Sequence, residues 1–165
     1  MGSNLTYGEI TTKGAHEMAT LIKPFIKPNS TFVDVGSGYG KLVQAIAELL
    51  EIKAIGIEID EEKYKIAKKI LWSNKKENIT LINGDFTQKE NLKIINSADL
   101  VFANNVTWDK NLTNTLFNNS KGHLFLMKYI AIEPKIKPEL IADITVSWFK
   151  DKKSRLYKIN TNTDR

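Results

Sequence analysis

Residues 31–41 constrain the fold of this 165-residue chain more strongly than any other stretch. Residues 32–35 are a short, mainly apolar run typical of a buried strand, and Gly36, Gly38 and Gly40 follow it at alternate positions. Glycines let the backbone turn tightly and let a ligand approach the bare main chain. Apolar side chains at helical spacing come next, and a helix N-terminus attracts electron-rich ligand groups. The stretch therefore predicts a strand, a tight turn and a helix that together bind a nucleotide-like ligand.

The spacing of the glycines indicates which nucleotide is bound. A dinucleotide-binding turn has the pattern G-x-G-x-x-G, with an acidic residue about 20 positions later. Here the pattern is G-x-G-x-G, and Asp34 lies two residues before Gly36. A carboxylate at that place would repel a pyrophosphate and attract the positively charged amino-acid end of S-adenosylmethionine. We therefore predict S-adenosylmethionine as the cofactor and S-adenosylhomocysteine as its product.

Two further predicted strands end in groups that suit the same ligand. Residues 54–58 predict a strand that ends in Glu58, whose carboxylate can accept hydrogen bonds from both ribose hydroxyls. Residues 79–83 predict another strand, followed by Asp85 as an acceptor for the adenine amino group and Phe86 as a ring for its face. A glycine turn alone also occurs in α/β proteins that bind nothing there. Acids at three successive strand ends are a stronger signal, because ligands of such sheets bind at the strand ends.

Length and composition limit the remaining possibilities. The chain is long enough for one domain with a substantial core, and it has no apolar run of the roughly 20 residues that span a membrane. We expect an intracellular protein that is not secreted and has no membrane segment. There is no cysteine, and the only histidines are His16 and His123, so no metal site is expected. The net charge of +5 comes almost wholly from lysine and favours an anionic partner or, equally, serves solubility.

The order of predicted elements gives the fold class. Strands and helices alternate through residue 128, and two strands at 142–149 and 154–161 are joined by a charged turn. This order predicts an α/β fold: a seven-stranded, Rossmann-like, doubly wound and mostly parallel sheet with a C-terminal antiparallel hairpin. We expect a single domain with a lid and N-terminal helix at 5–26, a cofactor-binding core at 31–128 and a substrate hairpin at 140–161.

Several motifs along the chain together resemble one family. In order, they are Tyr7-Gly8-Glu9, residues 32–40, Gly56-Ile57-Glu58, Gly84-Asp85-Phe86, residues 101–105 and Val146-Ser147-Trp148. Their order and approximate spacing resemble the disruptor-of-telomeric-silencing family, seven-strand non-SET methyltransferases that modify a lysine in the globular core of nucleosomal histone H3. The tyrosine and glutamate of the lid, the Asn104-Asn105 pair and the Ser-Trp step make the resemblance particular.

The resemblance implies roles for individual residues. Asn104 would match the asparagine that the family needs for methyl transfer, and Trp108, Trp148 and Tyr157 would surround the channel that admits the lysine. Lys41 stands where the family usually has a glutamine near the cofactor. The full cofactor-binding set is then Tyr7, Glu9, Asp34, Gly36, Gly38, Gly40, Lys41, Glu58, Asp85, Phe86 and Asn104.

The resemblance also implies the activity, a histone-lysine N-methyltransferase reduced to a minimal catalytic core. It would act in a nucleus on the nucleosome as a monomer, with lysine-rich faces (Lys65, Lys68, Lys69, Lys75, Lys76 and the turn at 150–153) against DNA or another acidic surface. Three alternatives stay open at this point. They are a lysine methyltransferase that acts on a non-histone protein, an RNA methyltransferase, and a non-catalytic module that binds chromatin.

Overall fold

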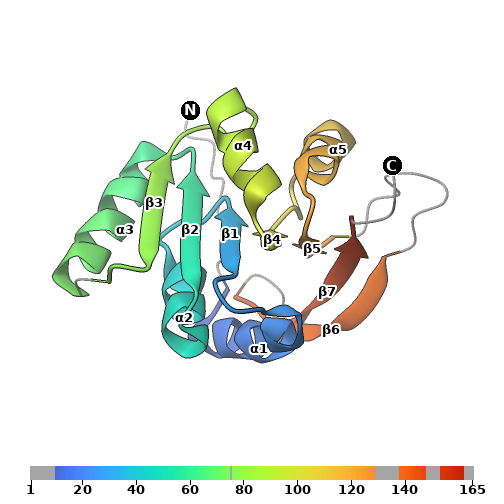
Figure 1. The fold of residues 1–165 in the computed structure, drawn as a ribbon, viewed down its shortest axis with the longest axis horizontal. Coiled ribbons are helices and arrows are strands. Elements are labelled where there is room, and N and C mark those ends of the chain that lie inside the picture. The colour runs from blue at the N-terminus through green and yellow to red at the C-terminus, as the bar shows by residue number, and fades with distance from the viewer. Residues whose placement is uncertain (1–9, 75, 129–137, 148–152, 162–165) are drawn as a thin grey trace.

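Residues 31–35 form an inner strand of a seven-stranded sheet, and the turn and helix that follow it extend to residue 50 (Figure 1). The computed structural model describes residues 10–74, 76–128, 138–147 and 153–161. The strands are β1 (Thr31–Val35), β2 (Lys53–Glu58), β3 (Ile79–Asn83), β4 (Leu100–Ala103), β5 (His123–Leu126), β6 (Glu139–Thr145) and β7 (Lys153–Asn160). The helices are α1 (Thr12–Ile22), the short 3-10 helix η1 (Lys23–Phe25), α2 (Lys41–Leu50), α3 (Glu61–Asn74), α4 (Lys89–Ser97) and α5 (Lys110–Asn119).

The strand order creates a crevice beside β1. The order is β3-β2-β1-β4-β5-β7-β6, and β1 to β5 are parallel to one another. Strand β7 runs antiparallel to both of its neighbours, β5 and β6. The chain winds outward from β1 in one direction and then returns to continue from β4 in the other, and ligands of doubly wound sheets bind at such a switch point. The predicted sheet, mostly parallel and closed by an antiparallel hairpin, is confirmed.

Helices cover both faces of the sheet, so the central strands are buried on both sides (Figure 1). One apolar cluster joins α1 and α2 to side chains such as Phe32, Phe102 and Phe125. A second cluster joins α4 and α5 to the alternate residues of the same strands, including Val33 and Val101. Burial on both sides explains why these strands are continuous apolar runs. The burial also gives Asp34, near the end of β1, an environment from which water is largely excluded.

The last two strands begin at different residues from those predicted. Strand β6 begins at Glu139 rather than at residue 142, and its pairing with β7 shifts between Leu140 and Ala142. The strand lies at the edge of the sheet and is only partly buried, so no clean alternation of apolar and polar residues marks its start. Residues 148 and 149, where the strand was predicted to end, lie outside the described residues. No helix in the described part of the chain is long and apolar enough to cross a membrane.

Candidate active site

The glycine turn has the left-handed backbone that its sequence predicts. Gly36, Gly38 and Gly40 have φ angles of 81°, 54° and 78°, a region that side chains disfavour. The amides of Gly36 and Ser37 donate to the carbonyl oxygen of Ile57 at 2.8 and 3.1 Å, so the turn is tied to β2. Gly40 is the N-cap of α2. The predicted turn therefore does open the helix, and its bare backbone lies at the strand ends.

Glu58 holds the turn from the neighbouring strand. Its carboxylate accepts hydrogen bonds from the amides of Gly38 at 2.6 Å and Asp60 at 2.8 Å, one on each oxygen. Glu58 is 7% exposed. Each carboxylate oxygen has a second lone pair, so these bonds leave acceptor capacity for a ligand hydroxyl. The residue thus shapes the turn, a role that the sequence reasoning did not anticipate, while its predicted contact with a ribose stays a prediction.

Asp34 is an unusual carboxyl group because it is buried at the end of β1. Only 4% of the residue is exposed. Burial, and to a lesser degree the negative charge of Glu58, raise the pKa of Asp34 to about 8. The group is therefore mainly protonated at neutral pH in the ligand-free protein. A cationic ligand group beside it would favour the ionised form, which is what the predicted contact with the amino-acid end of the cofactor requires.

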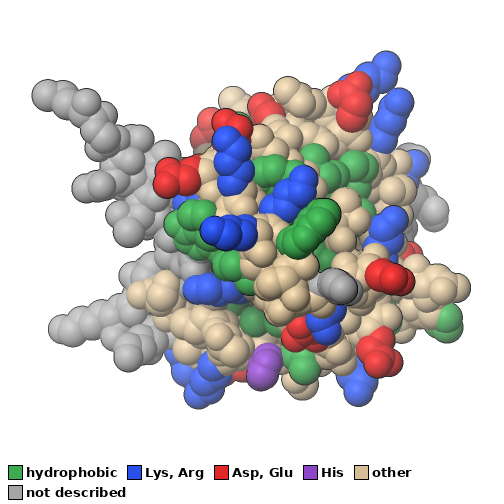
Figure 2. All heavy atoms as spheres, turned by 90° about the vertical axis from the view of Figure 1, so that its left-hand side faces the viewer, with side chains coloured by type: hydrophobic (Ala, Val, Ile, Leu, Met, Phe, Trp, Pro, Cys, Tyr) green, Lys and Arg blue, Asp and Glu red, His purple; other side chains and the backbone are tan. Residues whose placement is uncertain are grey.

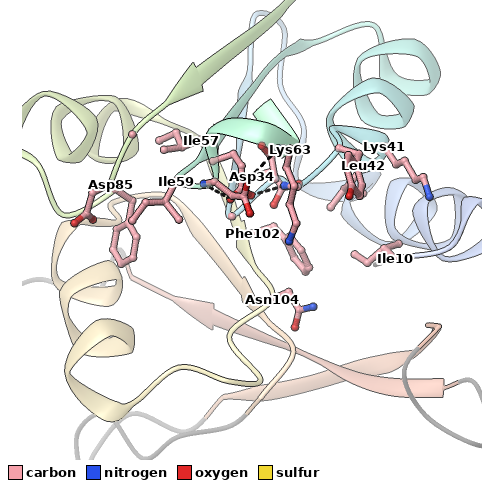
Figure 3. Close-up of a pocket in the computed structure, with 18 of the residues that line it drawn as sticks. Ile10, Asp34, Lys41, Leu42, Ile57, Ile59, Lys63, Asp85, Phe102 and Asn104 are labelled. Atoms are coloured by element: carbon pink, nitrogen blue, oxygen red, sulfur yellow. Dashed lines mark hydrogen bonds between the residues drawn. The ribbon is translucent and has the colours of Figure 1, made fainter. Parts of the chain in front are cut away.

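A cavity of about 430 Å³ lies at these strand ends, within the range of small-molecule sites. Figure 3 shows Asp34 near its centre, with Asp85 to one side, Lys41 and Leu42 to the other, and Asn104 below. The predicted residues that line the cavity are Asp34, Gly36, Gly38, Lys41, Glu58, Asp85, Phe86, Asn104 and Trp108. The structure therefore brings together acids that come from three different strand ends.

Two aromatic rings assigned to different parts of the site are in contact. Phe86 and Trp108 are stacked, with ring centroids 5.0 Å apart and planes 8° from parallel. Phe86 was predicted to lie against adenine, and Trp108 to wall the lysine channel. Trp108 therefore lies beside Phe86 in the cavity wall, and its place in a lysine channel stays a prediction. Asp85 accepts hydrogen bonds from the amide and the hydroxyl of Thr87, both at 2.8 Å, which fix its carboxylate at the rim.

The two asparagines after β4 have separate roles. Asn104 lines the cavity. Asn105 is fully buried, and its side-chain amide accepts a hydrogen bond from the amide of Lys128 at 2.9 Å and donates one to the carbonyl oxygen of Lys128 at 3.0 Å. This pair of bonds joins the end of β4 to the end of β5. Asn105 therefore stabilises the loop from which Asn104 faces the cavity.

Replacing Asn105 by alanine should destabilise the protein by about 2–3 kcal/mol, because two partly buried backbone groups of Lys128 lose their partner. Urea unfolding of the purified variant would measure this loss. The same substitution at Asn104 is the matched control and should reduce the free energy of unfolding by less. Equal losses at the two positions would contradict the division of roles.

Several predicted site residues are not placed in the cavity. Tyr157 is not among the described residues that line the cavity. It lies on β7 opposite Leu126 and Leu140. Its place in a lysine channel stays a prediction. Gly40 caps α2 just behind the cavity wall. Tyr7, Glu9 and Trp148 lie outside the described residues, as do residue 75 and the turn at 150–152.

Other residues line the cavity without having been predicted. They are Ile10, Ser37, Tyr39, Leu42, Ile57, Ile59, Asp60, Lys63, Gly84 and Phe102. Ile59 directly follows Glu58 and is 69% exposed, so it offers an apolar surface at the end of β2. Lys63, in the first turn of α3, extends into the cavity in Figure 3. The sequence could have indicated Ile59, because it directly follows the predicted site residue Glu58. It could not have indicated Lys63, whose place in the cavity depends on how α3 packs.

The lysines of α3 form part of a mixed surface. Lys65, Lys68 and Lys69 are exposed, as predicted. Lys65 forms an ion pair with Glu61 at 2.6 Å, and Lys76 forms one with Glu48 at 3.5 Å. Figure 2 shows that basic, acidic and apolar side chains are interspersed on this side of the molecule. Trp72, 79% exposed, is the largest apolar group on α3. Because charges of both signs are mixed here, we interpret this face as a solvated surface and not as a uniformly basic patch.

Fold and cavity together define the class of protein. A doubly wound sheet with a glycine turn after β1 and acids at the next strand ends is the architecture of class I S-adenosylmethionine-dependent methyltransferases. Among solved structures, TrmK of M. capricolum in complex with S-adenosylhomocysteine has a TM-score of 0.64 at 14% identity, covering 88% of this chain and 68% of its own. An RNA methyltransferase from Salinibacter ruber, with the same ligand, has a TM-score of 0.64 at 16% identity and covers 93% of this chain and 92% of its own. At these identities the likeness establishes the fold.

The sequence establishes the family. Residues 1–122 match the model of the histone methylation protein DOT1, so the chain belongs to the DOT1 family. A histone-lysine N-methyltransferase of Emericella nidulans, specific for lysine 79 of H3, is 28% identical over 130 residues, which are 72% of this chain and 25% of that enzyme. A ribosomal protein L11 methyltransferase of Acetivibrio thermocellus is 29% identical over 104 residues, 63% of this chain and 32% of that enzyme. The chain thus spans a quarter to a third of these relatives. The predicted family and the predicted cofactor, S-adenosylmethionine, are therefore both confirmed.

Proposed function

We propose that this protein transfers a methyl group from S-adenosylmethionine to the side-chain amine of a protein lysine, with a lysine in the globular core of nucleosomal histone H3 as its first candidate substrate. The observation that carries the proposal is the cavity in which Asp34, Glu58 and Asp85 meet beside Asn104, in a chain of the DOT1 family. The nucleus and the nucleosome follow from the same candidate substrate and share its test.

The donor sets on the cavity wall fit the cofactor. Asp34 is a buried carboxyl whose raised pKa leaves it ready to ionise beside a cation, which suits the amino-acid end. Glu58 has acceptor capacity for the ribose, and Asp85, Phe86 and Ile59 offer a polar and an apolar rim for the adenine. The bound cofactor supplies an electrophilic methyl group, and the protein positions it toward the acceptor.

The acceptor side of the cavity requires an uncharged amine, because an ammonium group has no lone pair to attack a methyl carbon. Phe102, Ile10 and Leu42 contribute apolar surface there, and such surroundings disfavour a charged ammonium and lower its pKa. Asn104 lines the cavity, and its proposed role is to align the amine by hydrogen bonding. A dedicated general base is not needed when the lysine gives its proton to bulk water before it enters an apolar channel.

The direct test offers radiolabelled S-adenosylmethionine to four acceptors: recombinant nucleosomes, free histones, bacterial ribosomal proteins and total RNA. We expect label on histone H3 in nucleosomes. Ribosomal proteins are included because a relative is a ribosomal protein methyltransferase, and label there would support a non-histone lysine substrate instead. Label on RNA would overturn the proposed lysine acceptor, and no release of S-adenosylhomocysteine with any acceptor would leave only a binding role.

Replacing Gly36 by arginine should weaken cofactor binding by at least about a hundredfold, measured by calorimetry with S-adenosylhomocysteine. Gly36 lines the cavity with a φ of 81°, and a Cβ there would meet no atom within 4 Å. An arginine side chain would thus project into open space needed by the ligand and bring a positive charge near Asp34. The matched control is alanine, which shares the backbone strain of about 1–2 kcal/mol without filling the cavity. Equal affinities of the two variants would contradict this placement.

A further inference from the structure

Three residues that do not line the cavity join the N-terminal helix to the C-terminal hairpin. Glu17 on α1 accepts hydrogen bonds from the amide of Thr145 at 2.7 Å and from its hydroxyl at 3.0 Å. Thr11, the N-cap of α1, donates its hydroxyl to the carbonyl oxygen of Thr145 at 3.2 Å. We call these contacts of Thr11 and Glu17 with Thr145 the Glu17 clasp. They join residues 128 and 134 positions apart in the chain.

The clasp supplies hydrogen-bond partners for the backbone of Thr145 at the open edge of the sheet. Thr145 is the last residue of β6, which lies at the end of the strand order, so its outward amide and carbonyl have no neighbouring strand to pair with. The carboxylate of Glu17 takes the amide and the hydroxyl of Thr11 takes the carbonyl. Gly14 allows this approach, because a Cβ at that position would overlap the carbonyl oxygen of Thr145. Helix and strand are thus in backbone contact.

One of the residues next to the clasp, Ile10, forms part of the cavity wall. Ile10 precedes Thr11, and Val146 follows Thr145; the two residues are paired by an isolated antiparallel bridge. Ile10 lines the cavity, and Val146 is fully buried. Because the clasp lies directly beside this bridge, it fixes the place of Ile10 in the cavity wall.

We propose that Glu17 is a positioning residue that couples cofactor binding to the placement of the acceptor site. This inference rests on the proposed function, in which Ile10 lies on the acceptor side of the cavity that also holds the cofactor. A ligand that contacts Ile10 biases its bridge to Val146, and the carboxylate of Glu17 keeps Ile10 and Val146 in register. Coupling of this kind requires one element that both ligands can contact, and Ile10, held by this bridge, is that element.

The test compares Glu17→Ala with Glu17→Gln, and with Glu48→Ala as a matched control on α2 outside the cavity. Alanine removes both acceptors. Glutamine keeps an oxygen for the amide of Thr145 and gains a donor for its hydroxyl, so it should behave like the natural protein. Hydrogen exchange of the amides at residues 10 and 145–147 is measured with and without S-adenosylhomocysteine, together with KM for nucleosomes and the Kd of S-adenosylhomocysteine.

In the natural protein, Glu17→Gln and Glu48→Ala, we expect S-adenosylhomocysteine to slow exchange at residues 145–147. In Glu17→Ala these amides should exchange about tenfold to a hundredfold faster without ligand and gain no protection from it. KM for nucleosomes at saturating cofactor should rise about tenfold, more than the Kd of S-adenosylhomocysteine changes. A merely structural role would lower the unfolding midpoint and leave the ligand-induced protection in place.

The outcomes separate this inference from the proposed function. If S-adenosylhomocysteine binds and protects residues 145–147 equally in the natural protein and in Glu17→Ala, the coupling is absent and the inference is wrong while the proposed function stands. If S-adenosylhomocysteine does not bind the natural protein at all, the proposed function fails first. If Glu17→Ala does not fold, Thr145→Val is used instead, because it removes the hydroxyl contact and keeps the amide.

Discussion

Replacing Asn104 by alanine should abolish methyl transfer, a loss of at least about a thousandfold in kcat, while the Kd for S-adenosylhomocysteine changes little. Asn104 lines the cavity just beyond the end of β4, next to the switch point of the sheet. The groups proposed to hold the cofactor come mainly from β1, β2 and the loop after β3, and the substitution leaves them in place. The substitution should therefore slow methyl transfer without weakening cofactor binding.

The measurement pairs single-turnover methyl transfer with calorimetry on the same preparation. Asn104→Asp is the informative second variant, because it keeps the size of the side chain and removes its two N–H donors. If alignment of the amine needs an acceptor, the aspartate variant should retain part of the rate; if it needs a donor, the aspartate variant should be as slow as alanine. Turnover like that of the natural protein in Asn104→Ala would remove Asn104 from the mechanism.

The parts of the site that sequence patterns predicted are those that follow directly from strand ends. Asp34, Glu58 and Asp85 each come at or just after a short apolar run, and parallel strands present their carboxyl ends at one edge, so the three acids had to meet. All three line the cavity. The turn was predictable for the same reason, because glycines at positions 36, 38 and 40 are confined to one segment. These inferences needed the period of a strand and the order of the elements, and both are local properties of the sequence.

The contacts that were not predicted join segments far apart in the chain. Phe86 and Trp108 are each recognisable as candidate site residues, but their stacking depends on the path of two loops across the sheet edge. In the sequence, Glu17 is indistinguishable from the other polar residues of an amphipathic helix. It gains its partner Thr145 because β6 lies beside α1. The distance of Tyr157 from the Ser-Trp step likewise does not say how many strands separate it from the cavity.

Replacing Asp34 by asparagine should have opposite effects on stability and on cofactor binding. In the folded protein without ligand, burial and the charge of Glu58 raise the pKa of Asp34 to about 8, from an ordinary value of 3.8. A raised pKa means that the stabilising contribution of the protonated group is complete below about pH 4. It is lost progressively as pH rises toward 8, because the unfolded chain ionises first. The natural protein should therefore lose stability across this range relative to Asp34→Asn.

Urea unfolding at pH 5, 7 and 8.5 would measure the stability effect. At pH 5 the folded natural protein holds a neutral carboxyl while the unfolded chain is already largely ionised, so the variant should be more stable by only about 1–2 kcal/mol. At pH 8.5 the variant should be more stable by a few kcal/mol, since it buries no charge. Other titrating groups are common to both proteins, so the difference between them isolates Asp34. A difference that does not change with pH would show that the carboxyl is ionised throughout.

Cofactor binding should follow the reverse order, and this gives the proposed role of Asp34 its sharpest test. A cation beside the carboxyl favours its ionised form, so binding near pH 6.5 should release close to one proton. Affinity for S-adenosylmethionine should rise up to about tenfold per pH unit between about pH 5.5 and 7, below the range of about pH 7.7–8 in which the α-amino group of the ligand loses its own proton. Calorimetry in phosphate and in Tris counts the proton, because the two buffers differ in ionisation enthalpy. Lys41 and Lys63 also line the cavity, but they are present in both proteins, so the comparison with Asp34→Asn isolates the carboxyl group. In Asp34→Asn the pH dependence should vanish together with most of the affinity, so the substitution that stabilises the free protein should be the one that disables it. Tight binding by that variant, or binding without proton release, would mean that the positive end of the ligand lies elsewhere.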